Sequence, residues 1–192
     1  MVEHDHVFKP EHADKLVSEE RQEEFPAENI VSLMNIQQGD IVADFGAGNG
    51  YFTIPIAKTT KDKIYAIDAE PKMLELLKER AEEEGIQTIE QVHAGVDDTP
   101  IADAAVDKVL ISRTIHHAPS VAGALQEMKR ILQPDGTLYI IEFYKDSTHD
   151  GPPMEMRITP DDMTEALHKA GFNAQVTQLT EAEYAVEAQK QT

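Results

Sequence analysis

The chain has 192 residues, a length suited to one domain with a single buried core and layers on both sides of it. Its 36 acidic and 17 basic residues give a net charge of -19, which repels phosphate backbones and anionic lipid surfaces, so we expect neither nucleic acid nor membrane partners. The chain has no cysteine, which excludes disulfides, thiolate metal sites and cysteine nucleophiles. Since it shows no signal-peptide pattern and no run of about 18 apolar residues, we expect a cytoplasmic protein. We expect it to be a monomer or a homodimer.

Residues 1–36 are charged and rich in Glu, His and Lys, with helix-compatible pieces at 13–24 and 26–35. We expect this segment to form a helical cover over a domain that comprises residues 37–192. Three of its histidines are candidate metal ligands: His4, His6 and His12. Their acidic neighbours and polar setting give no fixed ligand geometry, so we expect no metal.

From residue 40 onward, short apolar runs alternate with longer segments that have helical spacing. Prolines that suit a first helical turn stand at Pro71 and Pro119, each followed by a one-sided apolar stripe. This alternation predicts an α/β fold in which helices cover both faces of a doubly wound sheet. The expected strands are residues 41–45, 63–67, 88–93, 108–112 and 137–143.

The C-terminal part changes the pattern. A helix is expected to begin near residues 159–161 and to end at Gly171, and two strand-like pieces follow it at 173–179 and 183–188. The connection between these two pieces is so short that they can pair only as an antiparallel hairpin. We therefore expect a three-layer fold with about seven strands, mostly parallel, with one antiparallel strand near the C-terminal edge.

A glycine-rich turn, written DFGAGNGYF from Asp44, follows the first expected strand. Glycines there allow a tight turn and the close approach of a ligand to the backbone. A dinucleotide-binding turn spaces its glycines as G-x-G-x-x-G, so that a pyrophosphate can rest on the helix N-terminus. Tyr51 occupies the position of that third glycine, which argues against NAD.

The spacing D-x-G-x-G-x-G instead resembles motif I of the class I S-adenosylmethionine-dependent methyltransferases. Ile67-Asp68 ends the second strand, where that family places an acid on the ribose hydroxyls, and residues 106–111 resemble its fourth strand. Residues 115–136, from IHH to the turn LQPDG, are very similar to the type 11 subgroup, which includes quinone-ring methylating enzymes. The resemblance covers roughly residues 37–180 and implies a Rossmann-like methyltransferase fold with S-adenosylmethionine as cofactor.

The resemblance also implies which residues meet the cofactor. Asp44 is expected at the methionine amino group, Asp68 at the ribose and Met73 beside the adenine. The family often ends its third strand with Gly-Asp-Ala, but here the aspartate position falls on Gly95, so Asp97 or Asp98 is the candidate for the adenine amino group. The full set of expected cofactor-binding residues is Asp44, Gly46, Ala47, Gly48, Asp68, Ala69, Met73, Asp97, Asp98 and Ser112.

For the acceptor side, His116 and His117 are the candidate catalytic residues, because they follow the fourth strand and imidazole can accept a proton near neutral pH. Structural roles for both histidines remain an alternative. Arg113 or Arg157 could hold an anionic group of the substrate or form salt bridges within the protein. The chain lacks the proline-rich signature of amino-methylating nucleic acid enzymes, so we expect a small-molecule acceptor.

Two other functions are also compatible with the sequence. One is an NAD(P)-binding oxidoreductase built on a similar sheet. The other is a protein that binds S-adenosylmethionine without catalysis, since a fold alone does not establish a reaction.

Overall fold

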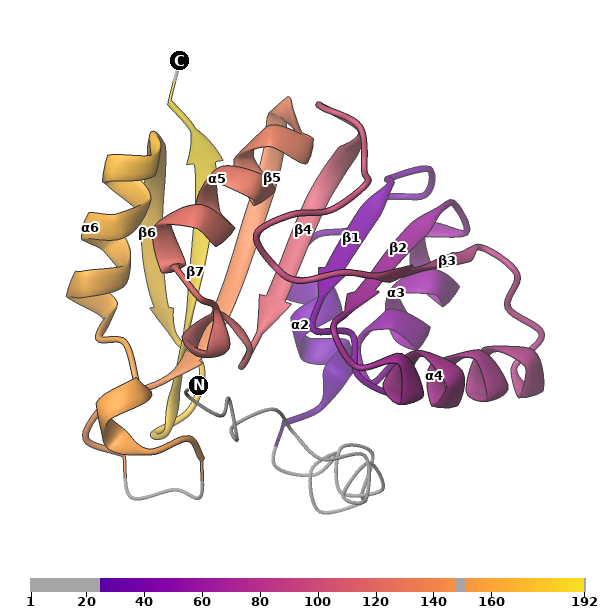
Figure 1. Ribbon diagram of the computed structural model, residues 1–192, viewed down its shortest axis with the longest axis horizontal. Coiled ribbons are helices and arrows are strands. Elements are labelled where there is room, and N and C mark those ends of the chain that lie inside the picture. The colour runs from indigo at the N-terminus through magenta and orange to yellow at the C-terminus, as the bar shows by residue number, and fades with distance from the viewer. Residues whose placement is uncertain (1–24, 148–150, 192) are drawn as a thin grey trace, which may run out of the picture.

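The computed structural model describes residues 25–147 and 151–191 and shows a seven-stranded sheet between two layers of helices (Figure 1). The strand order is β3-β2-β1-β4-β5-β7-β6. Only β7 is antiparallel to its neighbours, β5 and β6, which confirms the expected mixed sheet. The strands are β1 (Val42–Phe45), β2 (Ile64–Asp68), β3 (Ile89–His93), β4 (Val106–Ser112), β5 (Leu132–Phe143), β6 (Phe172–Gln178) and β7 (Glu183–Lys190).

The helices begin and end where their local sequence provides caps. Pro71 and Pro160 occupy first-turn positions, and the side chains of Ser120 and Thr159 accept hydrogen bonds from backbone amides of α5 and α6. Gly171, with φ of 85°, ends α6 in the left-handed region. The helices are α2 (Ala27–Leu33), α3 (Thr53–Thr60), α4 (Pro71–Glu83), α5 (Val121–Ile131) and α6 (Pro160–Ala170), with short 3-10 turns η2 (Ile115–His117) and η3 (Met154–Met156).

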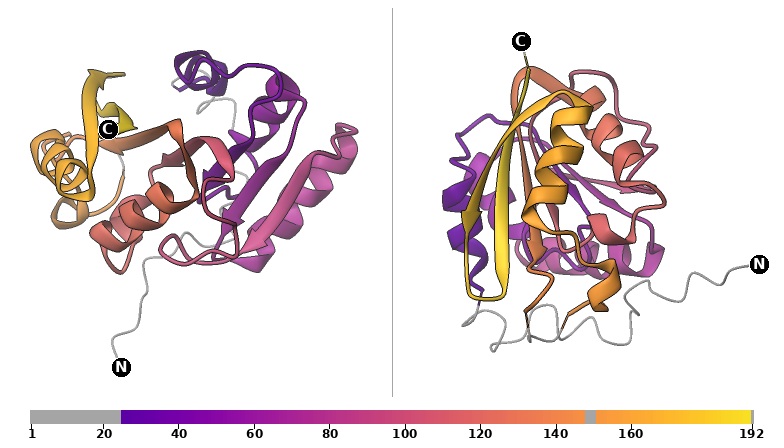
Figure 2. Two further views of the ribbon diagram at one scale, coloured as in Figure 1. Left: turned by 90° about the horizontal axis from the view of Figure 1, so that it is seen from above. Right: turned by 90° about the vertical axis from the view of Figure 1, so that its left-hand side faces the viewer.

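Hydrophobic side chains on both faces of the sheet form the core. On one face, α5 and α6 pack against the sheet in a cluster that includes Leu125, Met128 and Leu167. On the other face, α2 and α3 contribute Ile30 and Ile56, and α4 packs beside α3 and β2. Burying both faces explains why the central strands are continuous apolar runs. Figure 2 shows the long hairpin of β6 and β7 with α6 beside it.

The beginning of β5 differs from the prediction, which placed a simple turn at residues 134–136. Leu132 already pairs with Val106, and the regular register resumes only at Thr137, opposite Lys108. The residues between bulge out of the ladder, and Gly136 is needed there because a Cβ would overlap the Leu132 side chain and the Asp107 carbonyl. In the described part of the chain, no helix has both the length and the apolar content to cross a bilayer.

Gly50 provides a test of how tightly the glycine-rich turn is packed. It adopts φ of +89°, and a Cβ there would overlap Cδ1 of Leu77, a fully buried residue of α4. Gly39 has a similar φ of +96° but open space around it, so it is a matched control. We expect Gly39→Ala to lower the free energy of unfolding by about 1 kcal/mol through strain, and Gly50→Ala by roughly 2–4 kcal/mol through strain and overpacking. Urea denaturation measures both losses, and equal losses would contradict the packing argument.

Candidate functional site

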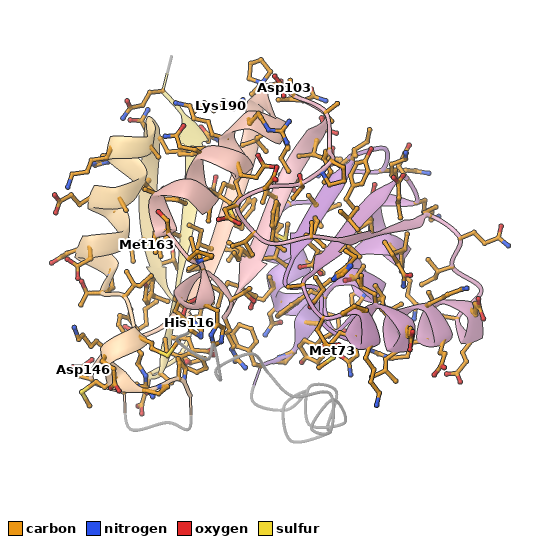
Figure 3. All side chains as sticks on the ribbon, in the orientation of Figure 1. Met73, Asp103, His116, Asp146, Met163 and Lys190 are labelled. Carbon is orange, nitrogen blue, oxygen red and sulfur yellow. The ribbon has the colours of Figure 1, made fainter. Side chains whose placement is uncertain are left out.

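The carboxyl ends of β1, β2, β4 and β5 meet at one edge of the sheet, because these neighbouring strands are parallel. This edge therefore carries the glycine-rich turn after β1, Asp68 at the end of β2 and the histidines after β4. Figure 3 shows Met73 and His116 at this edge, with Asp103 and Lys190 at the opposite one. The topology thus brings together the residues that the sequence singled out for cofactor and acceptor.

The glycine-rich turn is fixed to the end of β2. The amides of Gly46 and Ala47 both donate to the carbonyl oxygen of Ile67, at 2.8 and 3.0 Å. Gly46 adopts φ of +73°, and a Cβ there would overlap the Thr114 side chain, which approaches from the segment after β4. Glycine at this position therefore permits both the turn and the close contact with a segment from the acceptor side.

The carboxylate of Asp68 joins this turn to the start of α4. Its Oδ2 accepts the Gly48 amide at 2.8 Å and its Oδ1 accepts the Glu70 amide at 2.9 Å. A carboxylate has about four acceptor positions, so acceptor capacity remains for a further donor such as a ribose hydroxyl. Burial raises the pKa of Asp68, while the backbone amides of Glu70, Gly48 and Ala69 oppose the rise.

Asp44 lies at the base of the same turn and is almost completely buried. Its Oδ2 accepts a 2.6 Å hydrogen bond from the hydroxyl of Thr53, the first residue of α3. Burial raises the pKa of Asp44 to about 7, and the nearby charge of Asp68 adds to the rise, while the Thr53 bond opposes it. Sequence reasoning missed Thr53, although a hydroxyl residue at the start of a helix that follows the glycine-rich turn was a usable signal.

Two other expected cofactor residues border this acidic pair. Met73 is buried in α4, and the Ala69 carbonyl lies 3.1 Å from Nε2 of His93 at the end of β3. His93 was not predicted, although its place at the carboxyl end of a strand could have indicated it. Asp97 and Asp98 are both exposed in the turn after β3, so the adenine role of either residue stays a prediction.

The E-x-x-R pattern of α5 holds the segment after β3 in place. Glu127 accepts both the amide and the hydroxyl of Thr99, at 2.8 and 2.6 Å, and it pairs with Arg130 at 2.7 Å. Arg130 in turn donates to the Ile101 carbonyl at 2.7 Å. Burial alone would raise the pKa of Glu127, but the bonds from Arg130 and Thr99 outweigh it and lower that pKa. This pattern therefore fixes the segment after β3, and its residues are not among the expected cofactor contacts.

On the acceptor side, His116 forms a pair with Glu142 of β5. Nδ1 of His116 lies 2.8 and 2.9 Å from the two carboxylate oxygens. The His117 ring is tilted against that of His116, with 4.1 Å between ring centroids, and the side chain is exposed. Ser112 has a buried hydroxyl with no hydrogen-bond partner among the described residues. Sequence reasoning missed Glu142, although an acid near the end of a largely apolar strand was a signal for it.

The two arginines considered for substrate binding both have partners within the protein. Arg113 forms an ion pair with the buried Glu183, and its guanidinium lies between the rings of Phe25 and Phe143, 4.6 and 5.0 Å from their centroids. Arg157 is buried and donates to three backbone carbonyls, those of Tyr144, Ser147 and Pro152. Both side chains are therefore held by contacts within the protein.

The described residues do not form a metal centre. Across residues 25–147 and 151–191, no group of three or more His, Asp or Glu side chains is arranged to hold an ion. The expectation about His4, His6 and His12 lies outside the described residues.

The strand order, the glycine-rich turn and the acid at the end of β2 define the class I S-adenosylmethionine-dependent methyltransferase fold. Residues 43–140 match the family model described as a methyltransferase domain, of type 11. The chain belongs to the type 11 family of S-adenosylmethionine-dependent methyltransferases.

The chain is also similar to proteins that are named as methyltransferases. A demethylmenaquinone methyltransferase of Staphylococcus epidermidis is 28% identical over 116 residues, which cover 59% of this chain and 47% of that protein. The chain thus spans about half the length of the curated relatives it matches. The crystal structure of a SAM-dependent methyltransferase from Aquifex aeolicus has a TM-score of 0.88 at 27% identity and covers 95% of this chain and 98% of that one.

A third comparison shows the fold alone. The cyclase SpnF has a TM-score of 0.78 at 16% identity, covering 86% of this chain and 80% of that chain. The similarity extends to a protein named for a different reaction, which underlines that the fold does not by itself define the chemistry.

The buried carboxyl group of Asp44 makes the stability of the ligand-free protein depend on pH. Burial raises the pKa of this carboxyl from its ordinary value of 3.8 to about 7, so its stabilising effect is greatest below about pH 4 and is lost as the pH rises through 7. Asp44→Asn keeps an oxygen for the Thr53 hydroxyl but cannot ionise. Between about pH 5.5 and pH 8, we expect the wild type to lose about 2 kcal/mol of unfolding free energy relative to the variant. Urea titrations at both pH values check this, and parallel pH dependence would contradict a raised pKa.

Proposed function

We propose that the protein is an enzyme that transfers a methyl group from S-adenosylmethionine to a small-molecule acceptor. The observation that carries the proposal is the position of Asp68, whose two oxygens accept the amides of Gly48 and Glu70 and keep acceptor capacity for a further donor. That carboxylate stands beside a glycine-rich turn at the carboxyl edge of a parallel sheet, where such folds bind ligands.

The residues at this edge suit the different parts of S-adenosylmethionine. Asp68 would accept the ribose hydroxyls, and Asp44 would face the amino group, whose positive charge favours the ionised carboxylate. Met73, at the start of α4, would pack near the adenine. The remaining contacts in the proposal are Gly46, Ala47, Gly48, Ala69, Ser112 and one of Asp97 and Asp98. When bound, this cofactor supplies a methyl group already activated on a sulfonium.

The protein then has to place the acceptor in line with that methyl group and to exclude water. His116 and His117 stand at the same edge, after β4, and are the proposed acceptor-side groups. Phe25, Arg113 and Phe143 form a wall, in which the guanidinium of Arg113 lies over both rings on the chain segment that leads to His116. This wall separates part of the edge from solvent, since Phe25 and Phe143 are both buried.

The nature of the acceptor belongs to the same proposal. The name of the Staphylococcus relative, a demethylmenaquinone methyltransferase, supports a small organic acceptor, although this chain covers only 47% of that protein. The net charge of -19 disfavours a nucleic acid acceptor. A cytoplasmic location and a monomeric or homodimeric state complete the proposal.

Thermal stability with added ligands tests the choice of cofactor. A ligand that binds only the folded state raises the melting temperature as its concentration exceeds its Kd. We expect S-adenosylmethionine and its demethylated product to raise it, and NAD and NADP to leave it unchanged. Stabilisation by NAD or NADP alone would support the oxidoreductase alternative. Binding without any demethylated product across a broad acceptor panel would indicate a non-catalytic S-adenosylmethionine-binding protein.

The role of Asp68 is tested by the variant Asp68→Asn, which keeps the shape of the side chain but loses acceptor positions and charge. We expect its affinity for S-adenosylmethionine to fall at least tenfold, about 1.4 kcal/mol. Asp135→Asn is the matched control, because it makes the same charge change at an exposed residue in the bulge before the regular part of β5. Calorimetric titration measures both affinities, and an unchanged Kd in Asp68→Asn would remove Asp68 from the site.

A further inference from the structure

The pair formed by His116 and Glu142 is unusual for its burial. The His116 side chain is only 2% exposed and that of Glu142 is fully buried, yet both can carry charge. Nδ1 of His116 lies within hydrogen-bond distance of both carboxylate oxygens, at 2.8 and 2.9 Å. Burying a carboxylate is costly unless a donor satisfies it, so His116 stabilises Glu142 in place.

Two other possible donors in this region, Tyr184 and Arg113, have partners elsewhere. Tyr184 lies opposite Glu142 on β7, but its hydroxyl donates to the carbonyl of Ile158 at 2.8 Å. The Tyr144 ring is tilted against that of Tyr184, with 5.3 Å between ring centroids. Arg113, the cation on the segment before His116, is paired with Glu183. The hydrogen bond that Glu142 accepts therefore comes from the His116 ring.

This contact decides which ring nitrogen carries the proton. An ionised carboxylate only accepts hydrogen bonds, so Nδ1 of His116 must be the N–H. In the neutral ring, Nε2 then holds a free lone pair and can accept a proton. The carboxylate also stabilises the positive charge that the ring gains on accepting it, the same arrangement by which an acid orients a catalytic histidine in hydrolases.

On the basis of the proposed function, we propose that Nε2 of His116 is the proton acceptor for a phenolic acceptor substrate, and that Glu142 is the positioning residue that fixes its tautomer. As the new O–CH₃ bond forms and the carbon–sulfur bond breaks, the O–H electron pair stays on the substrate oxygen. The proton moves to Nε2, and the sulfur leaves as a neutral thioether. Charge and atoms balance without any further reactant.

The chemistry of an imidazole base selects the substrate class. A carboxylic acid is already ionised at neutral pH and needs no base, and a neutral amine can attack through its own lone pair. A phenolic hydroxyl has a pKa of about 10, so it is mostly protonated at neutral pH but lies within reach of a positioned base. Among carboxylic acids, amines and phenols, phenols are therefore the acceptors for which a buried His–Glu pair has the largest effect.

The tautomer can be measured without any acceptor. Long-range ¹H–¹⁵N spectra of the full-length ¹⁵N-histidine-labelled protein distinguish the two neutral forms, and the variant His116→Gln assigns the His116 signals. We expect the Nδ1–H form in the wild type and a shift toward Nε2–H in Glu142→Gln. Glu187→Gln, at an exposed position of β7, is the control and should leave the His116 signals unchanged. An Nε2–H form in the wild type, or a ring that stays charged up to about pH 9, would overturn the proposal.

Methyl transfer to two probes then tests the base. At about pH 8.5, 4-nitrophenol is already ionised, whereas unsubstituted phenol and 2-naphthol remain mainly protonated. We expect His116→Gln to lower kcat about 100-fold or more for the protonated phenols, Glu142→Gln to lower it at least tenfold, and both to change it less than about threefold for 4-nitrophenol. His168→Gln, at an exposed residue near the end of α6, should change neither.

The results of these experiments distinguish a failure of the His116 proposal from a failure of the proposed function. Equal losses for both kinds of probe would mean that His116 is not the base, as would full activity in Glu142→Gln. If the wild type binds S-adenosylmethionine but methylates no phenol, the substrate class is wrong while the cofactor assignment stands. If S-adenosylmethionine does not bind at all, the proposed function fails, and the tautomer result remains a fact about the pair. Thermal stabilisation by the demethylated cofactor checks that each variant is folded.

Discussion

The junction between the ends of β1 and β2 is the constraint on which the candidate site depends. Two amides of the glycine-rich turn donate to one carbonyl, that of Ile67, and the next residue, Asp68, accepts the amide of Gly48. These bonds set the direction of the chain as it enters α3 and hold the start of α4 close by. A ligand at this edge therefore meets backbone that is already fixed and pays little ordering entropy on binding.

Electrostatics at this junction suits a cationic ligand. Asp44 and Asp68 are close enough for their charges to interact, and burial raises the pKa of each. A positive charge placed between them would favour ionisation of both, so part of the free energy lost by burying two acids would be recovered on binding. The net charge of -19 extends the same preference over the whole molecule.

Much of this could be predicted from the sequence, because buried parallel strands are continuous apolar runs and their ends hold the functional residues. The glycine-rich turn, Asp44 and Asp68 were all found in this way. Glu142 was not, because strand periodicity does not reveal which side chain from another element will meet it, here 26 residues away. The same holds for Arg113, whose partner Glu183 lies 70 residues later, and for the bulge after Leu132, which depends on the neighbouring strand.

Arg113 also has a consequence for how the protein forms during synthesis. It lies at the end of β4 in the left-handed region, with φ of 53°, and its ion-pair partner is Glu183, the first residue of β7. The strands that carry Asp44 and Asp68 are made early and can pair with each other and with β4 as the chain emerges. The ion pair of Arg113 cannot form until Glu183, 70 residues later, has been made. The junction between β1 and β2 can therefore be assembled on the ribosome well before the contacts around Arg113 are complete.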